Sequence, residues 1–159
     1  MLTQSEADAL IAIPKRRAND RRYQFPNSGE TLIVPIISED GSESFLVDVN
    51  RGRIRITKCT FQERYRDIYI LVRLDIGGTP HTNPVVTTVP ASHLGPYNGQ
   101  AIQCPHLHLY MEGFEDRWAI PAPVNIFPRT GDLYATLIDF FRYCNIVEPP
   151  IIERGLFTC

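Results

Sequence analysis

Hydrophobic and polar residues alternate along several short segments, which is the pattern of strands with one buried and one exposed face. The longest alternation covers residues 64–76 and puts Tyr69, Arg73 and Asp75 on the face opposite its isoleucine and valine side chains. The same pattern predicts further strands at 30–38, 45–50, 53–61, 104–111 and 116–121. The predicted sheet therefore has a charged face outside the core.

Helical patterns lie near both ends of the chain. Thr3 and Glu6 have the spacing of a capping box, which predicts a short helix from about Thr3 to Ile13, before Pro14. Asp132 can cap a second helix whose apolar stripe is Leu133, Leu137, Phe140, Phe141 and Cys144. These patterns predict an α+β fold: an antiparallel sheet of five or six strands with a short N-terminal helix and a C-terminal helix. The apolar residues of 149–159 are expected to pack on its body.

The length of 159 residues predicts a single domain over 1–159. Residues 76–101 interrupt the strand pattern with a long connection rich in glycine and proline, and a loop of this length is more often functional than not. No apolar run is long enough to span a membrane, and we find no export signal, so a cytoplasmic protein without a membrane partner is expected. The four cysteines are spaced singly and are expected to be reduced thiols.

Basic residues are concentrated in two segments, although the net charge is only −2. Residues 51–73 carry seven basic against two acidic residues, and residues 15–22 carry five against one. Such a local surface can bind a phosphate backbone, although solvated arginines on strand faces are the commoner explanation. The expected contacts to a phosphate-bearing substrate are Arg55, Lys58, Arg64 and Arg73.

All four histidines lie between residues 81 and 108. His106 and His108 are two residues apart in a predicted strand and so share one face. If the strand 64–76 is their neighbour, they can form an acid/base pair for RNA cleavage, in which one removes the ribose 2′-hydroxyl proton and the other protonates the leaving oxygen. Arg73 or Lys58 would then stabilise the phosphorane. His81 and Asp75 would orient the substrate or a histidine, and Tyr69 would be auxiliary.

Two other interpretations remain open. His106, His108 and Glu112 spell H-x-H-x-x-x-E, which resembles the first metal motif of cupins and implies a divalent ion, with His81 or His93 completing a non-cupin site. The chain departs from the cupin pattern because no histidine follows residue 108 to form the second motif. Alternatively, the histidines are polar residues on a hydrated strand face, and the long loop is a protein-binding surface.

Three segments resemble an uncharacterised family of prokaryotic and phage-borne proteins. They are LVRLDIGGTPHTNP (71–84), CPHLHLYMEGFEDRWAIP (104–121) and DLYATLIDFFRYCNI (132–146). A more local similarity connects the Arg-Leu-Asp strand end, His81 and the PHLH segment to TumE-like toxins of toxin–antitoxin systems. That resemblance implies a nuclease toxin, although this chain has a single His81 where those proteins have two adjacent histidines.

The sequence thus favours a metal-independent RNA-cleaving toxin or mobile-element effector with His106 and His108 as its acid/base pair. Its expected partners are RNA and a cognate antitoxin or host defence protein, with no cofactor. The alternatives are a non-catalytic binding module, such as a phage-encoded inhibitor of a host defence system, and a divalent-metal enzyme. The sequence leaves the oligomeric state open.

Overall fold

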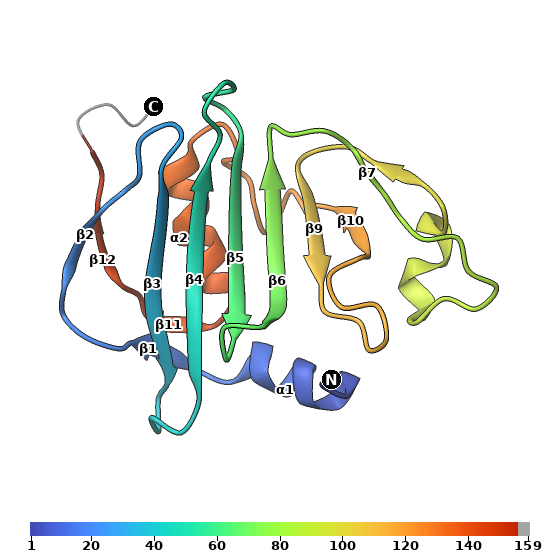
Figure 1. The fold of residues 1–159 in the computed structure, drawn as a ribbon, viewed down its shortest axis with the longest axis horizontal. Coiled ribbons are helices and arrows are strands. Elements are labelled where there is room, and N and C mark those ends of the chain that lie inside the picture. Colours follow the sequence, from blue (N-terminus) through green and yellow to red (C-terminus); the bar gives the residue numbers. More distant parts are fainter. Residues whose placement is uncertain (156–159) are drawn as a thin grey trace.

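A computed structural model gives the fold of the protein, and it describes residues 1–155 (Figure 1). The helices are α1 (Gln4–Ala12), the 3₁₀ helix η1 (Ser92–Tyr97) and α2 (Leu133–Tyr143). The strands are β1 (Lys15–Arg17), β2 (Arg22–Gln24), β3 (Thr31–Ser38), β4 (Ser44–Arg51), β5 (Cys59–Tyr65), β6 (Tyr69–Ile76), β7 (His81–Thr82), β8 (Ala101–Ile102), β9 (His106–Leu109), β10 (Ala119–Pro121), β11 (Ile146–Glu148) and β12 (Ile151–Glu153).

The main sheet has eight strands in the order β10-β9-β6-β5-β4-β3-β1-β11. All neighbouring strands in it are antiparallel except β1 and β11. The α+β class and the two terminal helices are confirmed, but the predicted five or six strands are too few. The sheet is extended at its edges by the three-residue strands β1, β10 and β11, of which only β10 falls in a predicted strand, the one at 116–121.

The hydrophobic core lies between one face of this sheet and α2, which runs behind the sheet in Figure 1. The Asp132 side chain caps α2 by accepting from the backbone N–H of Ala135 at 3.0 Å. The predicted stripe is buried, and the ring centroids of Phe61 and Phe140 lie 5.9 Å apart across the layers. The segment after α2 continues into β11 and into β12, which pairs with β2, and buries Ile152 as expected; residues 156–159 lie outside the described part.

The capping box of α1 is present, and this helix lies against the ends of β6 and β9. Glu112 accepts a hydrogen bond from the backbone N–H of Gln4 at 2.9 Å, and the Tyr110 hydroxyl contacts the backbone of Leu2. The carboxylate of Glu112 thus accepts a hydrogen bond from a backbone N–H in the first turn of α1 that has no partner within the helix.

The strand predicted at 53–61 forms only from Cys59 onward. Residues 52–58 make an exposed turn that is closed by hydrogen bonds from Gly52 N–H to Lys58 O at 2.8 Å and from Lys58 N–H to Arg55 O at 3.0 Å. The alternation there buries nothing, since Ile54 is 96% exposed.

A bulge in β6 also changes the predicted faces. Glu63 pairs with Val72 and Arg64 with Ile70, so Leu71 is an additional residue. Arg73 and Asp75 keep the polar face, whereas Tyr69 turns to the core side and packs on Tyr110 and Tyr65.

The loop at 76–101 is folded. Its two short strands β7 and β8 pair with each other at one side of the main sheet, and η1 buries Leu94 against Met111 and Trp118 (Figure 1). Among the described residues, no helix has the length and apolar character needed to cross a membrane.

Candidate functional site

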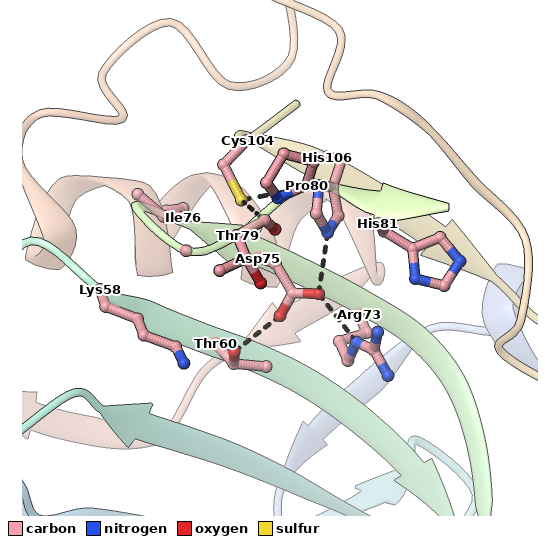
Figure 2. Close-up of a pocket in the computed structure, with 11 residues that line it drawn as sticks. Lys58, Thr60, Arg73, Asp75, Ile76, Thr79, Pro80, His81, Cys104 and His106 are labelled. Carbon is pink, nitrogen blue, oxygen red and sulfur yellow. Dashed lines mark hydrogen bonds and ion pairs between the residues drawn. The ribbon is translucent and has the colours of Figure 1, made fainter. Parts of the chain in front are cut away.

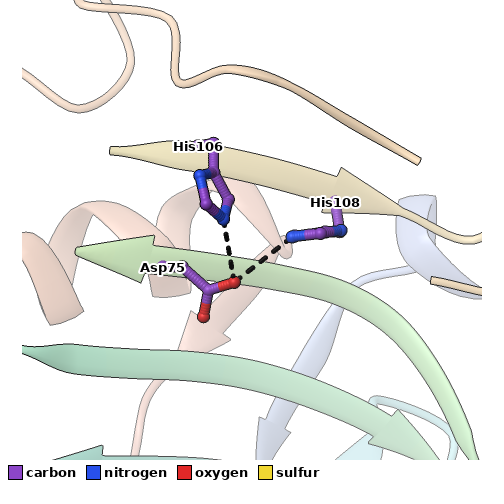
Figure 3. Close-up of side chains that lie close together, drawn as sticks. All are labelled: Asp75, His106 and His108. Atoms are coloured by element: carbon purple, nitrogen blue, oxygen red, sulfur yellow. Dashed lines mark hydrogen bonds and ion pairs between the residues drawn. The ribbon is translucent and has the colours of Figure 1, made fainter. Parts of the chain in front are cut away.

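Two neighbouring strands place the candidate residues on the polar face of the sheet. Asp75 lies directly opposite His106, and Arg73 lies opposite His108, in the antiparallel pairing of β6 with β9. Directly opposite side chains on one face approach to about 5 Å at their Cβ atoms, so the register alone brings these groups together. Figure 3 shows both imidazoles directed at the Asp75 carboxylate, with each Nε2 3.2 Å from Oδ2.

The Asp75 carboxylate is the centre of the cluster. Its Oδ1 accepts from the Thr60 hydroxyl at 2.6 Å, and its Oδ2 accepts from Arg73 Nε at 3.0 Å. Burial raises the pKa of Asp75, but its contacts with the two histidines, with Thr60 and with Arg73 outweigh that effect and hold the pKa well below its usual range. Asp75 is therefore an ionised acceptor at neutral pH.

His108 has both ring nitrogens engaged and is fully buried. Its Nδ1 lies 2.8 Å from the backbone oxygen of Asp116, which can only accept, so Nδ1 carries the hydrogen. Its Nε2 lies 2.9 Å from Arg73 Nη2, which can only donate, and 3.2 Å from the Asp75 carboxylate, which can only accept. Burial lowers the pKa of His108. The Asp75 carboxylate acts in the opposite direction, and the positive charge of Arg73 lowers the pKa further. The lowered pKa favours a neutral His108, whose Nε2 then accepts from Arg73, the nearer of the two groups.

His106 and His81 each have one nitrogen engaged with an acceptor. His106 donates from Nε2 to Asp75, while its Nδ1 has only the weakly polar Cys104 Sγ nearby, at 3.6 Å. His81 Nε2 donates to the backbone oxygen of Arg117 at 2.8 Å. The two rings lie 6.0 Å apart between centroids. Each therefore keeps a second nitrogen with which it can accept or deliver a proton.

These two histidines line a cavity of about 210 Å³. Its other lining residues are Lys58, Thr60, Arg73, Asp75, Ile76, Gly78, Thr79, Pro80 and Cys104. In Figure 2 the Lys58 ammonium lies to the left of Asp75 and the Arg73 guanidinium to its right. His106 lies above Asp75 and His81 at the upper right. His108 does not line this cavity. The cavity combines two proton-transfer groups with two cations, which suits an anionic substrate.

The structure brings together five of the predicted site residues: Lys58, Arg73, Asp75, His81 and His106 all line the cavity. His108 lies directly behind them. The other predicted residues do not join this group.

Tyr69 is at the far end of β6 on the core side of the bulge, and its hydroxyl accepts from the N-terminal ammonium. Arg64 lies further along the polar face and is held by a two-point contact with Asp48, at 2.6 and 2.9 Å. Arg55 is on the exposed turn. His93 is exposed on η1. The structure therefore does not bring Tyr69, the predicted auxiliary residue, into the group around the cavity.

The structure does not bring Glu112 of the predicted H-x-H-x-x-x-E donor set to the two histidines, because its carboxylate accepts from the first turn of α1. Within residues 1–155, the group of side chains whose donor atoms converge is Asp75, His106 and His108, all within 4.8 Å of one another. A carboxylate and two imidazoles are donors that divalent transition metals accept. Arg73 already faces two of these three donors, through Nε at Asp75 and Nη2 at His108.

Three contributors to the site were not predicted. Thr60 lies opposite Asp75 on β5. Cys104 precedes β9 and touches His106, and Asp116 binds Arg73 through its carboxylate and His108 through its backbone. Once β5 and β6 were aligned, their register would have indicated Thr60. No sequence signal marks Asp116, since its role depends on the path of the turn between β9 and β10.

The model of DUF6978, a family of unknown function, matches residues 2–146. The chain belongs to DUF6978. This match confirms the predicted resemblance to an uncharacterised family. The matched range includes the site described above, from Lys58 to Asp116. No curated protein and no solved structure matches the chain. The similarity to TumE-like toxins is not shown by these comparisons and stays a prediction.

Proposed function

We propose that the protein cleaves RNA without a metal ion, through acid/base catalysis by His106 and His81. The observation that carries this proposal is the disposition of their ring nitrogens: each histidine donates from one nitrogen to a fixed acceptor and presents the other beside a cavity that also holds Lys58 and Arg73. A base that is oriented by a carboxylate is a recurring catalytic arrangement. The proposal replaces His108 by His81 as the second member of the pair.

The proposed reaction is an intramolecular transesterification. His106 Nδ1 takes the proton of a ribose 2′-hydroxyl, and the 2′-oxygen attacks the adjacent phosphorus and forms a new P–O bond. The bond from phosphorus to the 5′-oxygen breaks, and protonated His81 delivers its Nδ1 proton to that oxygen. The products are a 2′,3′-cyclic phosphate and a free 5′-hydroxyl. A proton exchange with water then restores both histidines.

The remaining groups have supporting roles in this proposal. The Asp75 carboxylate fixes the tautomer and orientation of His106 and stabilises the imidazolium that forms during proton abstraction. Arg73 and Lys58 stabilise the charge that develops on the phosphorane oxygens. Neutral His108 positions Arg73, because it accepts one N–H of the guanidinium fork while Asp116 and Asp75 accept others.

The test is an RNA cleavage assay with the purified protein. Wild-type protein is expected to cut a mixed single-stranded RNA in the presence of EDTA and to leave 2′,3′-cyclic phosphate ends. His106→Ala and His81→Ala should each lower the rate by about 10²–10⁴-fold, the usual contribution of general acid/base catalysis. His93→Ala, which changes the exposed histidine on η1, is the matched control and should cleave normally. Intact RNA after incubation with the wild-type protein would refute the proposal.

The cellular role proposed with this activity is that of a toxin or mobile-element effector that acts on RNA in the cytoplasm, with an antitoxin or a host defence protein as partner. Expression of wild-type protein should then arrest growth, and His106→Ala should relieve the arrest. A binding module, such as an inhibitor of host defence, would instead keep its effect when both His81 and His106 are alanine.

The convergence of Asp75, His106 and His108 favours a second candidate, a divalent-metal enzyme. The Arg73 guanidinium counts against it, since a cation within 3.0 Å of Asp75 Oδ2 repels a second cation at the same donors. Titration with Zn²⁺ or Mn²⁺ separates the two candidates. Stoichiometric binding that is lost in His108→Ala, together with activity that EDTA abolishes, would favour the metal enzyme.

A further inference from the structure

More than half of the basic residues that lack an acidic partner among the described residues lie in one segment. Of the sixteen lysines and arginines, nine form an ion pair with a carboxylate within residues 1–155. Four of the other seven lie within residues 51–58: Arg51, Arg53, Arg55 and Lys58. No carboxylate of the described residues pairs with them, so this segment can attract an external anion.

The turn 52–58 holds these charges in a defined position. Arg51 Nη2 donates to the backbone oxygen of Ile56 at 3.0 Å, in addition to the hydrogen bonds that close the turn. On its other side the turn packs on Gly77, where an added Cβ would lie only 2.5 Å from the Thr57 oxygen. Arg53, Arg55 and Lys58 are exposed on this fixed support.

A polar depression connects the turn to the proposed catalytic cavity. It has a volume of about 420 Å³ and shares Lys58, Thr60, Arg73 and Asp75 with the cavity. Its remaining lining residues are Asn50, Arg51, Gly52 and Gln62. None of the aromatic side chains in residues 1–155 lines it, so it offers cations and hydrogen bonds to a sugar–phosphate backbone rather than a stacking surface for bases.

We propose that the turn 52–58 and this depression bind the phosphodiester backbone of single-stranded RNA next to the bond that is cleaved, with Arg53, Arg55 and Lys58 at successive phosphates. This inference rests on the proposed function. An unpaired strand is required because His106 is only 2% exposed, and a phosphate in a regular duplex cannot leave the helical backbone to reach it.

The test is the salt dependence of binding by wild-type protein to a 2′-O-methyl oligonucleotide, which lacks the attacking hydroxyl and so cannot be cleaved. Each phosphate contact to a single strand contributes about 0.7 to the slope of log affinity against log salt. Arg53→Gln with Arg55→Gln should therefore reduce the slope by about 1.4, so that between 50 and 200 mM salt the wild type loses about 7-fold more affinity than the variant. The control, Arg21→Gln with Arg66→Gln, removes two exposed arginines elsewhere and should keep the wild-type slope.

The outcomes separate this inference from the catalytic proposal. An unchanged slope in the Arg53/Arg55 variant, or equal binding of the corresponding duplex, would overturn the docking site even if wild-type protein cleaves RNA. Single-strand binding with the expected slopes, but without cleavage of unmodified RNA, would support the docking site and refute the catalysis.

Discussion

Glu63 is buried in the core with a cation beside it but without a well-formed hydrogen bond. Its carboxylate lies 3.3 Å from Lys15 Nζ, and both side chains are fully buried. The Lys15 ammonium donates instead to the backbone oxygens of Ile11, Ile13 and Cys144, and neither carboxylate oxygen of Glu63 has a hydrogen-bond partner in the described part of the chain. Burial raises the pKa of Glu63 to about 7, with Lys15 acting in the opposite direction.

This raised pKa makes the free energy of unfolding fall as the pH rises. Between the ordinary glutamate pKa of 4.5 and the folded-state value of about 7, the folded protein holds a proton that the unfolded chain has released. Stability therefore decreases by about 1.4 kcal/mol per pH unit across this window. The full loss is about 3 kcal/mol, a large share of the stability of a domain of this size.

The assay is urea unfolding of wild-type protein and Glu63→Gln between pH 4.5 and 8. The variant keeps the shape of the side chain but cannot titrate, and the three carbonyl partners of Lys15 remain. The difference in unfolding free energy, wild type minus variant, should fall by about 3 kcal/mol over this range. Groups that do not contact Glu63, including His108 with its lowered pKa, cancel in the difference. A difference that stays constant with pH would refute the reasoning.

Three other substitutions test separate parts of the fold. Gly77→Ala places a Cβ against the Thr57 oxygen at positive φ, so it should displace the turn that presents Lys58. Oligonucleotide binding, measured by anisotropy, should weaken clearly, whereas the melting temperature should change little. Phe140→Ala empties the centre of the core and should cost about 3–5 kcal/mol in urea unfolding. Asp132→Ala removes the cap of α2 and should cost about 1 kcal/mol by the same measurement.

The periodicity predicted the long central strands because each of them buries one face against α2. It did not predict β1 or β11, since three residues are too few for a period to be recognised. It also failed over residues 53–58, where isoleucines alternate with arginines but remain exposed on a turn. The alternation of side chains is necessary for an amphipathic strand but does not ensure that a partner surface exists.

The candidate site was predicted in part, for a similar reason. Clustering of the histidines, together with Asp75 on a neighbouring strand, indicated the residues that the register of β6 and β9 brings together. The bulge at Leu71 places Tyr69 on the opposite face of the sheet. A bulge of this kind has no characteristic residue type, so it could not be predicted from the sequence. The contacts of Asp116 with His108 and of Arg117 with His81 are made by backbone oxygens, which every residue possesses.

Those two backbone oxygens each engage one ring nitrogen of a histidine. They belong to consecutive residues of the same turn, yet the oxygen of Asp116 binds His108 Nδ1 and the oxygen of Arg117 binds His81 Nε2. For His108 the remaining nitrogen then meets Arg73 and is occupied, whereas for His81 it stays beside the cavity. The sequence alone does not distinguish His81 from His108. They differ in which ring nitrogen is left available, because the turn between β9 and β10 fixes Nε2 of His81 and Nδ1 of His108. In the proposed reaction, the division into a reacting histidine and a positioning histidine is therefore a property of the backbone path.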